Sequence, residues 1–259
     1  MRVVRNTGYI KTRQRAGRLV AWGGGLALLF SLVLTFVTPG LILPAYVVLI
    51  LGFIGFQYGM QQVTKWSRKP SADQVLDNAL RRLNDRFTLI HYSDAVPGHP
   101  EHILVGPAGL IVITTRDVFG QVKVKDNRFH RAGGRLWFLV GMGSPQLGNP
   151  TAESEREQKN LADFLTTHNL AGADDIEGVI TFLPNPRRPL ELEVISSDIT
   201  VVTLDQLYNA IRDLSGDTML TKQQRDEIVE ALSQGEGIEG PQTLPTGPQP
   251  GAKKRARAA

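Results

Sequence analysis

The stretch from Leu19 to Met60 reads LVAWGGGLALLFSLVLTFVTPGLILPAYVVLILGFIGFQYGM and contains no charged residue. A helix needs about 20 mainly apolar residues to cross the ~30 Å hydrocarbon layer of a membrane. The stretch is therefore long enough for two such helices, which we expect at residues 19–37 and 41–60. The sequence Thr-Pro-Gly at 38–40 separates them and supplies the turn chemistry of a tight helical hairpin.

The charges beside the hairpin predict its orientation. Residues 1–18 contain six basic residues and no acidic one, three more basic residues follow at 65–69, and the connection at 38–40 carries no charge. The positive-inside rule places such basic flanks in the cytoplasm. We therefore expect an integral protein of the cell membrane, with both termini in the cytoplasm and the lipid bilayer as a partner.

Glycines in the two spans predict how the helices meet. They are Gly23, Gly24, Gly25, Gly52, Gly55 and Gly59. Small residues let two helices approach closely inside a membrane. The same residues could join two copies of the hairpin, so a homo-oligomer is a second expectation, and simple helix irregularity is the alternative.

Charge and cysteine content narrow the function of the remaining chain. The formal net charge is +4, but residues 70–252 contain all 25 acidic residues and 16 of the 29 basic ones, a net charge of −9. Such an acidic domain is poorly suited to bind nucleic acid over a broad face. The chain has no cysteine, which excludes disulfides and cysteine-based zinc sites.

Hydrophobic periodicity predicts a mixed α/β domain at 70–232, between a basic cytoplasmic N-terminus at 1–18 with its hairpin and a disordered basic tail at 233–259. Helices are expected at 71–84, from 151, at 204–214 and at 221–232, and strands at 87–92, 103–105, 110–113, 119–124, 136–140, 178–183 and 199–203. The continuous apolar runs at 103–105 and 110–113 are typical of strands covered on both faces. The order of elements predicts a mixed sheet with flanking helices.

One segment of this domain resembles a known family. Residues 99–116 read HPEHILVGPAGLIVITTR, which resembles the core of the NERD (nuclease-related) domain. In that family an acid and a histidine precede an apolar strand, a Gly-Pro-x-Gly turn and a strand that ends in an acid-x-lysine motif. The similarity covers most of residues 71–232 and continues through Gly120, Asn149-Pro150 and Asn160-Leu161. It implies a restriction-endonuclease-like fold and a Mg²⁺-dependent phosphodiesterase.

The motif positions of the family are altered in this chain. The first acid corresponds to Glu101, with His102 beside it, but the second acid corresponds to Thr114 and the lysine to Arg116. Threonine brings no charge to a metal ion, and arginine stays protonated and cannot act as a base. We therefore expect a domain that is catalytically degenerate and needs no cofactor, with Glu101 the one candidate metal ligand. As alternatives, Glu101 is an exposed acid before a strand, and His102 is a structural hydrogen-bonding residue.

A local basic cluster is the other candidate site. It surrounds the strand expected at 119–124 and consists of Lys123, Lys125, Arg128, Arg131 and Arg135. Lys123 and Lys125 are two residues apart and share one face of the strand. The cluster could hold the phosphates of a nucleic acid or of anionic lipid, or it is an ordinary solvated strand face.

Three functions follow from these features. The first is a membrane-anchored NERD-like module that acts by binding or assembly at the membrane without catalysis. The second is a Mg²⁺-dependent nuclease tethered to the membrane, with nucleic acid as its partner. The third is a scaffold that assembles through its hairpin. The altered motif positions and the acidic domain favour the first.

Overall fold

The computed structural model describes residues 1–131, 147–185, 189–214 and 219–242. The helices are α1 (Thr7–Val37), the short 3-10 turn η1 (Pro39–Leu41), α2 (Ile42–Trp66), α3 (Ala72–Leu80), α5 (Pro150–Thr167), α6 (Leu204–Asp213) and α7 (Lys222–Ser233). The strands are β1 (Arg2–Arg5), β2 (Thr88–His91), β3 (His102–Gly106), β4 (Gly109–Arg116), β5 (Gly120–Lys125), β6 (Arg128–Arg131), β7 (Ile176–Phe182), β8 (Leu190–Val194), β9 (Thr200–Thr203) and β10 (Ile238–Glu239).

The central sheet is mixed, as the sequence predicts. Its strand order is β10-β1-β2-β3-β4-β7-β9. Strands β1 and β2 are parallel, β3 is antiparallel to both β2 and β4, and β4, β7 and β9 are parallel to one another. The carboxyl ends of β1, β2, β4, β7 and β9 therefore meet at one edge, which we name the carboxyl edge.

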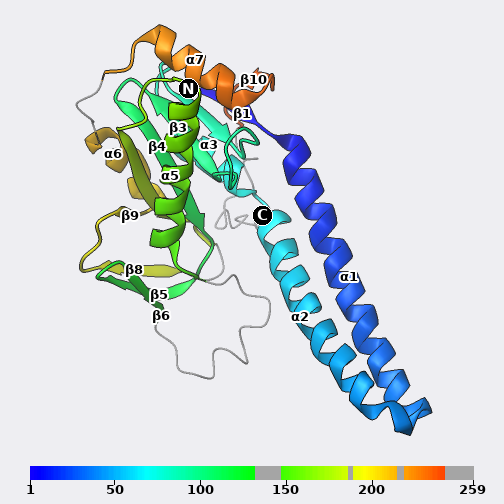
Figure 1. Cartoon of the computed structure of the whole chain (residues 1–259). Coiled ribbons are helices and arrows are strands. Elements are labelled where there is room, and N and C mark those ends of the chain that lie inside the picture. Colours follow the sequence, from blue (N-terminus) through cyan, green and yellow to red (C-terminus); the bar gives the residue numbers. More distant parts are fainter. Residues whose placement is uncertain (132–146, 186–188, 215–218, 243–259) are drawn as a thin grey trace, which may run out of the picture.

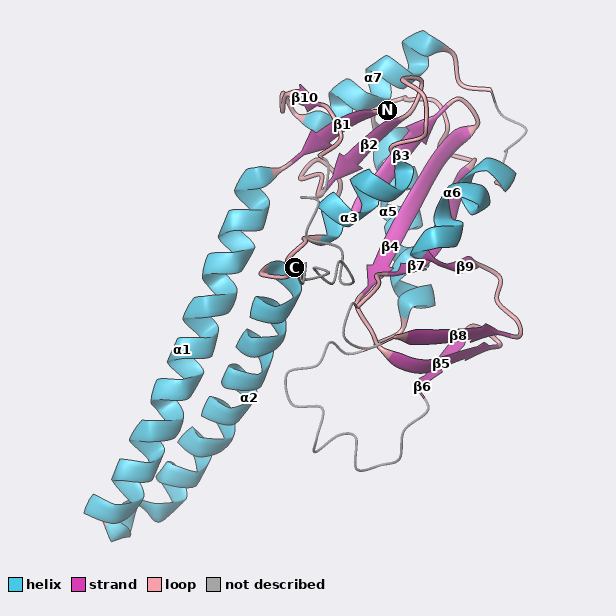
Figure 2. Cartoon of the chain, turned by 180° about the vertical axis from the view of Figure 1, so that it is seen from behind, coloured by secondary structure: helices cyan, strands magenta, loops and turns pink. Residues whose placement is uncertain are grey.

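Helices cover both faces of this sheet (Figure 2). Alternate residues of β3 and β4 belong to two different cores: Ile103 and Val112 pack with Leu161 of α5 and with α7, whereas Leu104 and Ile113 pack with α3 and α6. The continuous apolar runs predicted to be covered on both faces are thus confirmed. Between β3 and β4 the chain turns at Gly109, whose φ of +123° suits glycine.

A second, smaller sheet has the order β6-β5-β8. Its inward side chains, among them Val122 and Val124, pack on Phe182 of β7. Along β5, buried and exposed residues alternate, as predicted for a strand with one solvated face. The small sheet lies beyond the carboxyl edge, on the side of the domain toward which the hairpin helices extend (Figures 1 and 2).

The apolar stretch forms two long helices, α1 and α2, that pack side by side and project from the domain with their connection at the far end (Figure 1). Both are long and apolar enough to cross a membrane. Glycine allows their close contact, because a Cβ atom at Gly24 would lie 2.3 Å from the backbone nitrogen of Phe56. A Cβ atom at Gly59 would lie 2.3 Å from the nitrogen of Ala21. Gly24 and Gly59 therefore form the close contact between the two helices of one chain.

Two boundaries differ from the sequence-based expectation. Residues 2–5, expected in the basic cytoplasmic N-terminus at 1–18, form β1 and pair with β2 in the central sheet. The first helix begins at Thr7, where the Asn6 side chain accepts a hydrogen bond from the nitrogen of Tyr9 at 2.7 Å, so the helix includes most of the basic flank. The hairpin is therefore inserted between two neighbouring strands rather than attached in front of the domain.

The structure also contains three strands that the sequence does not predict, β6, β8 and β10. Strand β10 pairs with β1 although it lies in the segment expected to be disordered. The strand expected at 136–140 and the residues from 243 onward lie outside the described residues.

Candidate functional site

A row of buried polar side chains crosses three neighbouring strands at the carboxyl edge. Arg5 of β1 lies opposite His91 of β2, and His91 lies opposite His102 of β3. Directly opposite residues project from the same face of a sheet. Each is two residues along its strand from an apolar side chain of the core under α3 and α6. The row therefore lies between that apolar core and the carboxyl edge, on the same face of the sheet.

Acidic residues of α3 pair with this row. Asp77 accepts a hydrogen bond from Nη2 of Arg5 at 2.5 Å, and its second oxygen lies 3.0 Å from Nε2 of His91. Asp73 forms an ion pair with Nε of Arg5 at 2.6 Å. Burial alone would raise the pKa of Asp77, but the hydrogen bond and charge of His91 outweigh it and lower this pKa. Arg5 is thus held by two buried carboxylates.

The two histidines of the row bond to each other. Their Nδ1 atoms are 2.7 Å apart, so one ring donates and the other accepts. Burial, followed by the charge of His91, lowers the pKa of His102 well below its usual value. His102 is therefore neutral at pH 7, and its Nε2 atom makes no hydrogen bond to any residue that the structure describes.

Glu101 lies just before β3 and is buried, with 5% of its surface exposed. One carboxylate oxygen binds Nζ of Lys65, in the last turn of α2. The other accepts hydrogen bonds from the hydroxyl of Thr115 at 2.8 Å and from its backbone nitrogen at 3.3 Å. Burial alone would raise the pKa of Glu101, but the positive charge of Lys65 and smaller contributions from neighbouring groups together outweigh burial and lower this pKa to about 2. The carboxylate is ionised, and both oxygens have partners.

Thr114 points to the opposite face of β4. Its hydroxyl donates to Glu157 of α5 at 3.2 Å. Burial and the negative charges of Glu101 and Glu153 raise the pKa of Glu157 to about 8. At neutral pH Glu157 therefore keeps its proton and carries no charge.

Arg116 is fixed at the end of β4 by three partners. Its guanidinium donates to the carbonyl oxygens of Thr115 at 2.8 Å and of Leu147 at 3.3 Å, and it forms an ion pair with Glu153 of α5. Beside it lies a cavity of about 240 Å³ between α2 and the carboxyl edge. Lys65 also lines this cavity, which therefore lies next to the contact between the hairpin and the motif residues.

The four motif residues thus lie around the carboxyl end of β4 but on two faces, Glu101 and His102 on the α3 side and Thr114 and Arg116 on the α5 side. Glu101 is buried rather than exposed, and His102 hydrogen-bonds within the row. Four further residues belong to this site without being predicted from the sequence: Lys65, Glu157, Asp77 and Arg5. Glu157 had a detectable signal, because it precedes Leu161 and Phe164 at helical spacing on the inward face of α5.

The basic cluster lies elsewhere, on the small sheet. Lys123, Lys125 and Arg128 are exposed, and Lys123 pairs with Glu193 of β8 at 3.2 Å. Arg131 donates to the carbonyl oxygen of Phe119 at 2.6 Å and lies over its ring. Arg135 lies outside the described residues. Glu193 of β8 therefore neutralises part of this face.

The donor set at the motif does not fit a Mg²⁺ ion. Such an ion prefers several ionised or polar oxygens with free lone pairs. Glu101 is ionised but its oxygens are occupied, Thr114 is uncharged, and Glu157 is protonated. Among the residues that the structure describes, no group of three or more histidine and acidic side chains could hold a metal ion.

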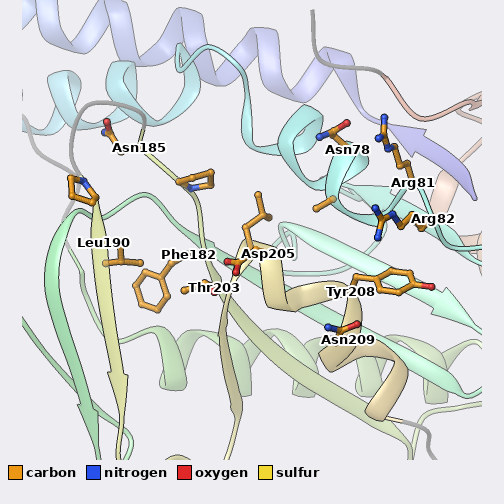
Figure 3. Close-up of a pocket in the computed structure, with 14 residues that line it drawn as sticks. Asn78, Arg81, Arg82, Phe182, Asn185, Leu190, Thr203, Asp205, Tyr208 and Asn209 are labelled. Atoms are coloured by element: carbon orange, nitrogen blue, oxygen red, sulfur yellow. The ribbon is translucent and has the colours of Figure 1, made fainter. Parts of the chain in front are cut away.

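A larger cavity, of about 550 Å³, lies between α3, α6 and the segments around β8 (Figure 3). Arg81 and Arg82 lie toward one end of it and Asn185 toward the other, with Asp205 between them. None of the predicted site residues lines this cavity.

Both the motif residues and this larger cavity lie at the carboxyl edge, where open α/β sheets bind their ligands. The motif residues are the candidate functional site, because buried ionisable side chains with shifted pKa values gather there. Comparisons with protein-family models, curated proteins and solved structures found no match to this chain. Its function is therefore inferred from the geometry of the site.

Proposed function

We propose that this chain is a membrane-anchored NERD-like module with a restriction-endonuclease-like core, which acts by binding or assembly at the cytoplasmic face of the membrane and has lost nuclease chemistry. In this proposal α1 and α2 cross the bilayer and both termini are cytoplasmic. The observation that carries it is the ion pair between Lys65 and Glu101. A residue of the membrane hairpin occupies the one ionised carboxylate of the motif.

Contacts at both ends of the hairpin support a domain held against the membrane. Helix α1 follows β1 after one residue, so its start is fixed by the pairing of β1 with β2. At the end of α2, the Trp66 ring packs on Tyr9 and Tyr92, with ring centroids 5.7 and 5.1 Å apart. The start of α1 and the end of α2 both join the domain directly. These two ends and the domain therefore lie on the same side of any membrane that the hairpin crosses.

The chemistry of the motif residues supports the loss of catalysis. Hydrolysis of a phosphodiester by a metal-activated water needs carboxylates that converge on the metal ion. Here Lys65 neutralises Glu101, and Arg116 pairs with Glu153 and cannot give up its proton. Each ionised group of the motif thus has an internal partner.

The second candidate function is a Mg²⁺-dependent nuclease tethered to the membrane. One observation favours it: Glu101, Glu153 and Glu157 each contact a residue at the end of β4, and the charges of the first two add to burial in raising the pKa of Glu157. Three glutamates therefore approach the end of β4, and Lys65 stands near the first of them. An ion that ionised Glu157 would need to displace Lys65 from Glu101.

A cleavage assay on the full chain in detergent separates the two functions. Single- and double-stranded DNA and RNA are incubated with Mg²⁺ or Mn²⁺, and we expect no cleavage. Glu101→Ala is the diagnostic variant, and Glu227→Ala, an exposed position on α7, is its matched control. Cleavage that disappears in Glu101→Ala but persists in Glu227→Ala would overturn the proposal in favour of the nuclease.

The orientation has its own test, which uses the absence of cysteine. Single cysteines are introduced at Gly40, in the connection of the hairpin, and at Gly237, near the last described residues. A side chain at either position would meet no atom within 4 Å. In intact cells a membrane-impermeant maleimide should label Gly40→Cys and not Gly237→Cys. The reverse pattern, or equal labelling, would contradict the proposed topology.

A further inference from the structure

A groove runs along the outer surface of the hairpin, between α1 and α2. Its volume is about 500 Å³, and its lining includes Arg18, Trp22, Gly25 and Leu29 of α1 and Phe56 and Met60 of α2. Apart from Arg18, all the lining residues are apolar. The groove therefore combines an apolar channel with one cation.

Glycine creates this groove. Gly24 contacts α2 so closely that no side chain would fit there. Gly25 is the next residue and faces the Phe56 ring, which a Cβ atom would approach only to 3.8 Å. The missing side chain at Gly25 thus leaves a hollow beside Phe56 rather than a packed contact.

The length of the groove matches one leaflet of a bilayer. Arg18 and Leu29 are 11 residues apart in α1, which corresponds to about 16 Å at the helical rise. Half of the hydrocarbon thickness is ~15 Å. A hollow in this layer loses dispersion contacts unless an apolar group enters it. An acyl chain of the leaflet on the domain side has the length to fill it.

Charge selects the lipid. Arg18 is exposed at the domain end of the groove, and no acidic residue occurs before residue 70 in the sequence. Among the residues that the structure describes, no carboxylate pairs with Arg18. We propose that this groove binds an anionic phospholipid of the domain-side leaflet, with its phosphate on Arg18 and one acyl chain along Trp22 to Leu29. This inference rests on the proposed crossing of the membrane by α1 and α2.

Trp22 makes the groove directly observable. The chain has three tryptophans, Trp22, Trp66 and Trp137, and replacement of the last two by phenylalanine leaves Trp22 as the reporter. The full chain is reconstituted in vesicles that contain brominated phosphatidylglycerol or brominated phosphatidylcholine, because bromine quenches tryptophan fluorescence on contact. We expect phosphatidylglycerol to be preferred about fivefold, the ratio that corresponds to ~1 kcal/mol for one cation near an anionic headgroup.

Two pairs of variants assign this preference to the groove. Arg18→Gln should abolish it, whereas Arg15→Gln, at an exposed position outside the groove, should retain it. Gly25→Leu should fill the hollow and reduce quenching by either lipid. Its control is Gly23→Leu, because a Cβ atom at Gly23 would meet no atom within 4 Å and Gly23 does not line the groove.

The outcomes separate the lipid site from the membrane anchor. Equal quenching by the two lipids, or a preference that survives Arg18→Gln, would overturn the lipid site and leave the anchor standing. Protection of Trp22 that increases with the ratio of protein to lipid would identify a second hairpin as the occupant and overturn the proposal. The absence of quenching by either lipid would overturn the anchor and the lipid site together.

Discussion

At the carboxyl end of β4, each of the two faces of the sheet carries a buried glutamate, and the two glutamates differ in their surroundings. On the α3 face, Thr115 and Lys65 hold Glu101 as an anion with a pKa of about 2. On the α5 face, Thr114 is the hydrogen-bonding neighbour of Glu157, whose pKa is about 8. Two adjacent threonines thus contact one carboxyl group that is ionised and one that is neutral at pH 7.

The difference shows what decides the charge of a buried acid in this chain. Burial disfavours the charged form of both glutamates. Glu101 receives a cation from α2, whereas Glu157 faces the negative charges of Glu101 and Glu153. The last turn of the hairpin therefore supplies, in Lys65, the largest of the contributions that favour the ionised form of Glu101.

The largest expected effect comes from breaking the charged row on the α3 face. Asp77→Ala leaves Arg5 and His91 without their shared partner. Loss of one partner from a buried ion pair costs about 3–5 kcal/mol in the free energy of unfolding. Denaturant unfolding of the full chain in detergent measures this loss. Asp163→Ala, at an exposed position of α5, is the control and should change stability little; equal effects would show that the row is not a source of stability.

Glu157 predicts a dependence of stability on pH. The folded chain keeps this proton up to about pH 8, whereas the unfolded chain releases it near the ordinary pKa of 4.5. The folded state therefore binds more protons between these values, and its stability falls as the pH rises from 4.5 to 8. Glu157→Gln should remove the decline and increase the free energy of unfolding at pH 7 by about 3 kcal/mol.

The prediction is tested by measuring the free energy of unfolding of the parent chain and of Glu157→Gln over a series of pH values. Glu155→Gln, at a neighbouring exposed position of α5, provides the matched control. A variant Glu157→Gln that is less stable than the parent at pH 8 would show that Glu157 is ionised and usefully paired in the folded chain.

For Glu101 we expect stability to change with pH in the opposite direction, and at lower pH. Its folded pKa of about 2 lies below the unfolded value of 4.5, so its contribution is complete above pH 4.5 and is lost as the pH falls toward 2. Lys65 is about half exposed, and solvent weakens its ion pair. Glu101→Gln should therefore cost only about 1–2 kcal/mol at pH 7. A double-mutant cycle with Lys65→Gln measures the coupling between the two side chains, and a coupling of zero would refute a stabilising ion pair between the hairpin and the motif.

Much of this architecture could be predicted from the sequence, and the rest could not for a physical reason. The strands around Ile103 and Val112 have continuous apolar runs, which are a local signal. Strand β1 has none, because its four residues combine two valines with two arginines, and its partners β2 and β10 are distant in the sequence. Its membership of the sheet is decided by long-range pairing.

The candidate site shows the same division. The resemblance located Glu101, Thr114 and Arg116, since these lie in one continuous segment. The charge state of the segment depends on Lys65, which has the appearance of an ordinary basic flank, and on Glu157, which belongs to a helix some 40 residues later. Only the fold brings these two side chains to β4.

The smallest expected effect is the response to divalent cations, and it bears most directly on function. An ion held between Glu101 and Glu157 would require both carboxylates to be ionised, so it would lower the pKa of Glu157 and release a proton. We expect no such change. The protonated carboxyl of Glu157 can be followed by infrared difference spectroscopy of the full chain between pH 5 and 9, with Glu157→Gln to assign the band. An unchanged midpoint with Mg²⁺ or Mn²⁺ fits a motif that the hairpin has neutralised. A midpoint that moves to lower pH with Mn²⁺, and does not move in Glu101→Gln, would mean that the two faces of β4 share a cation and that the nuclease function is retained.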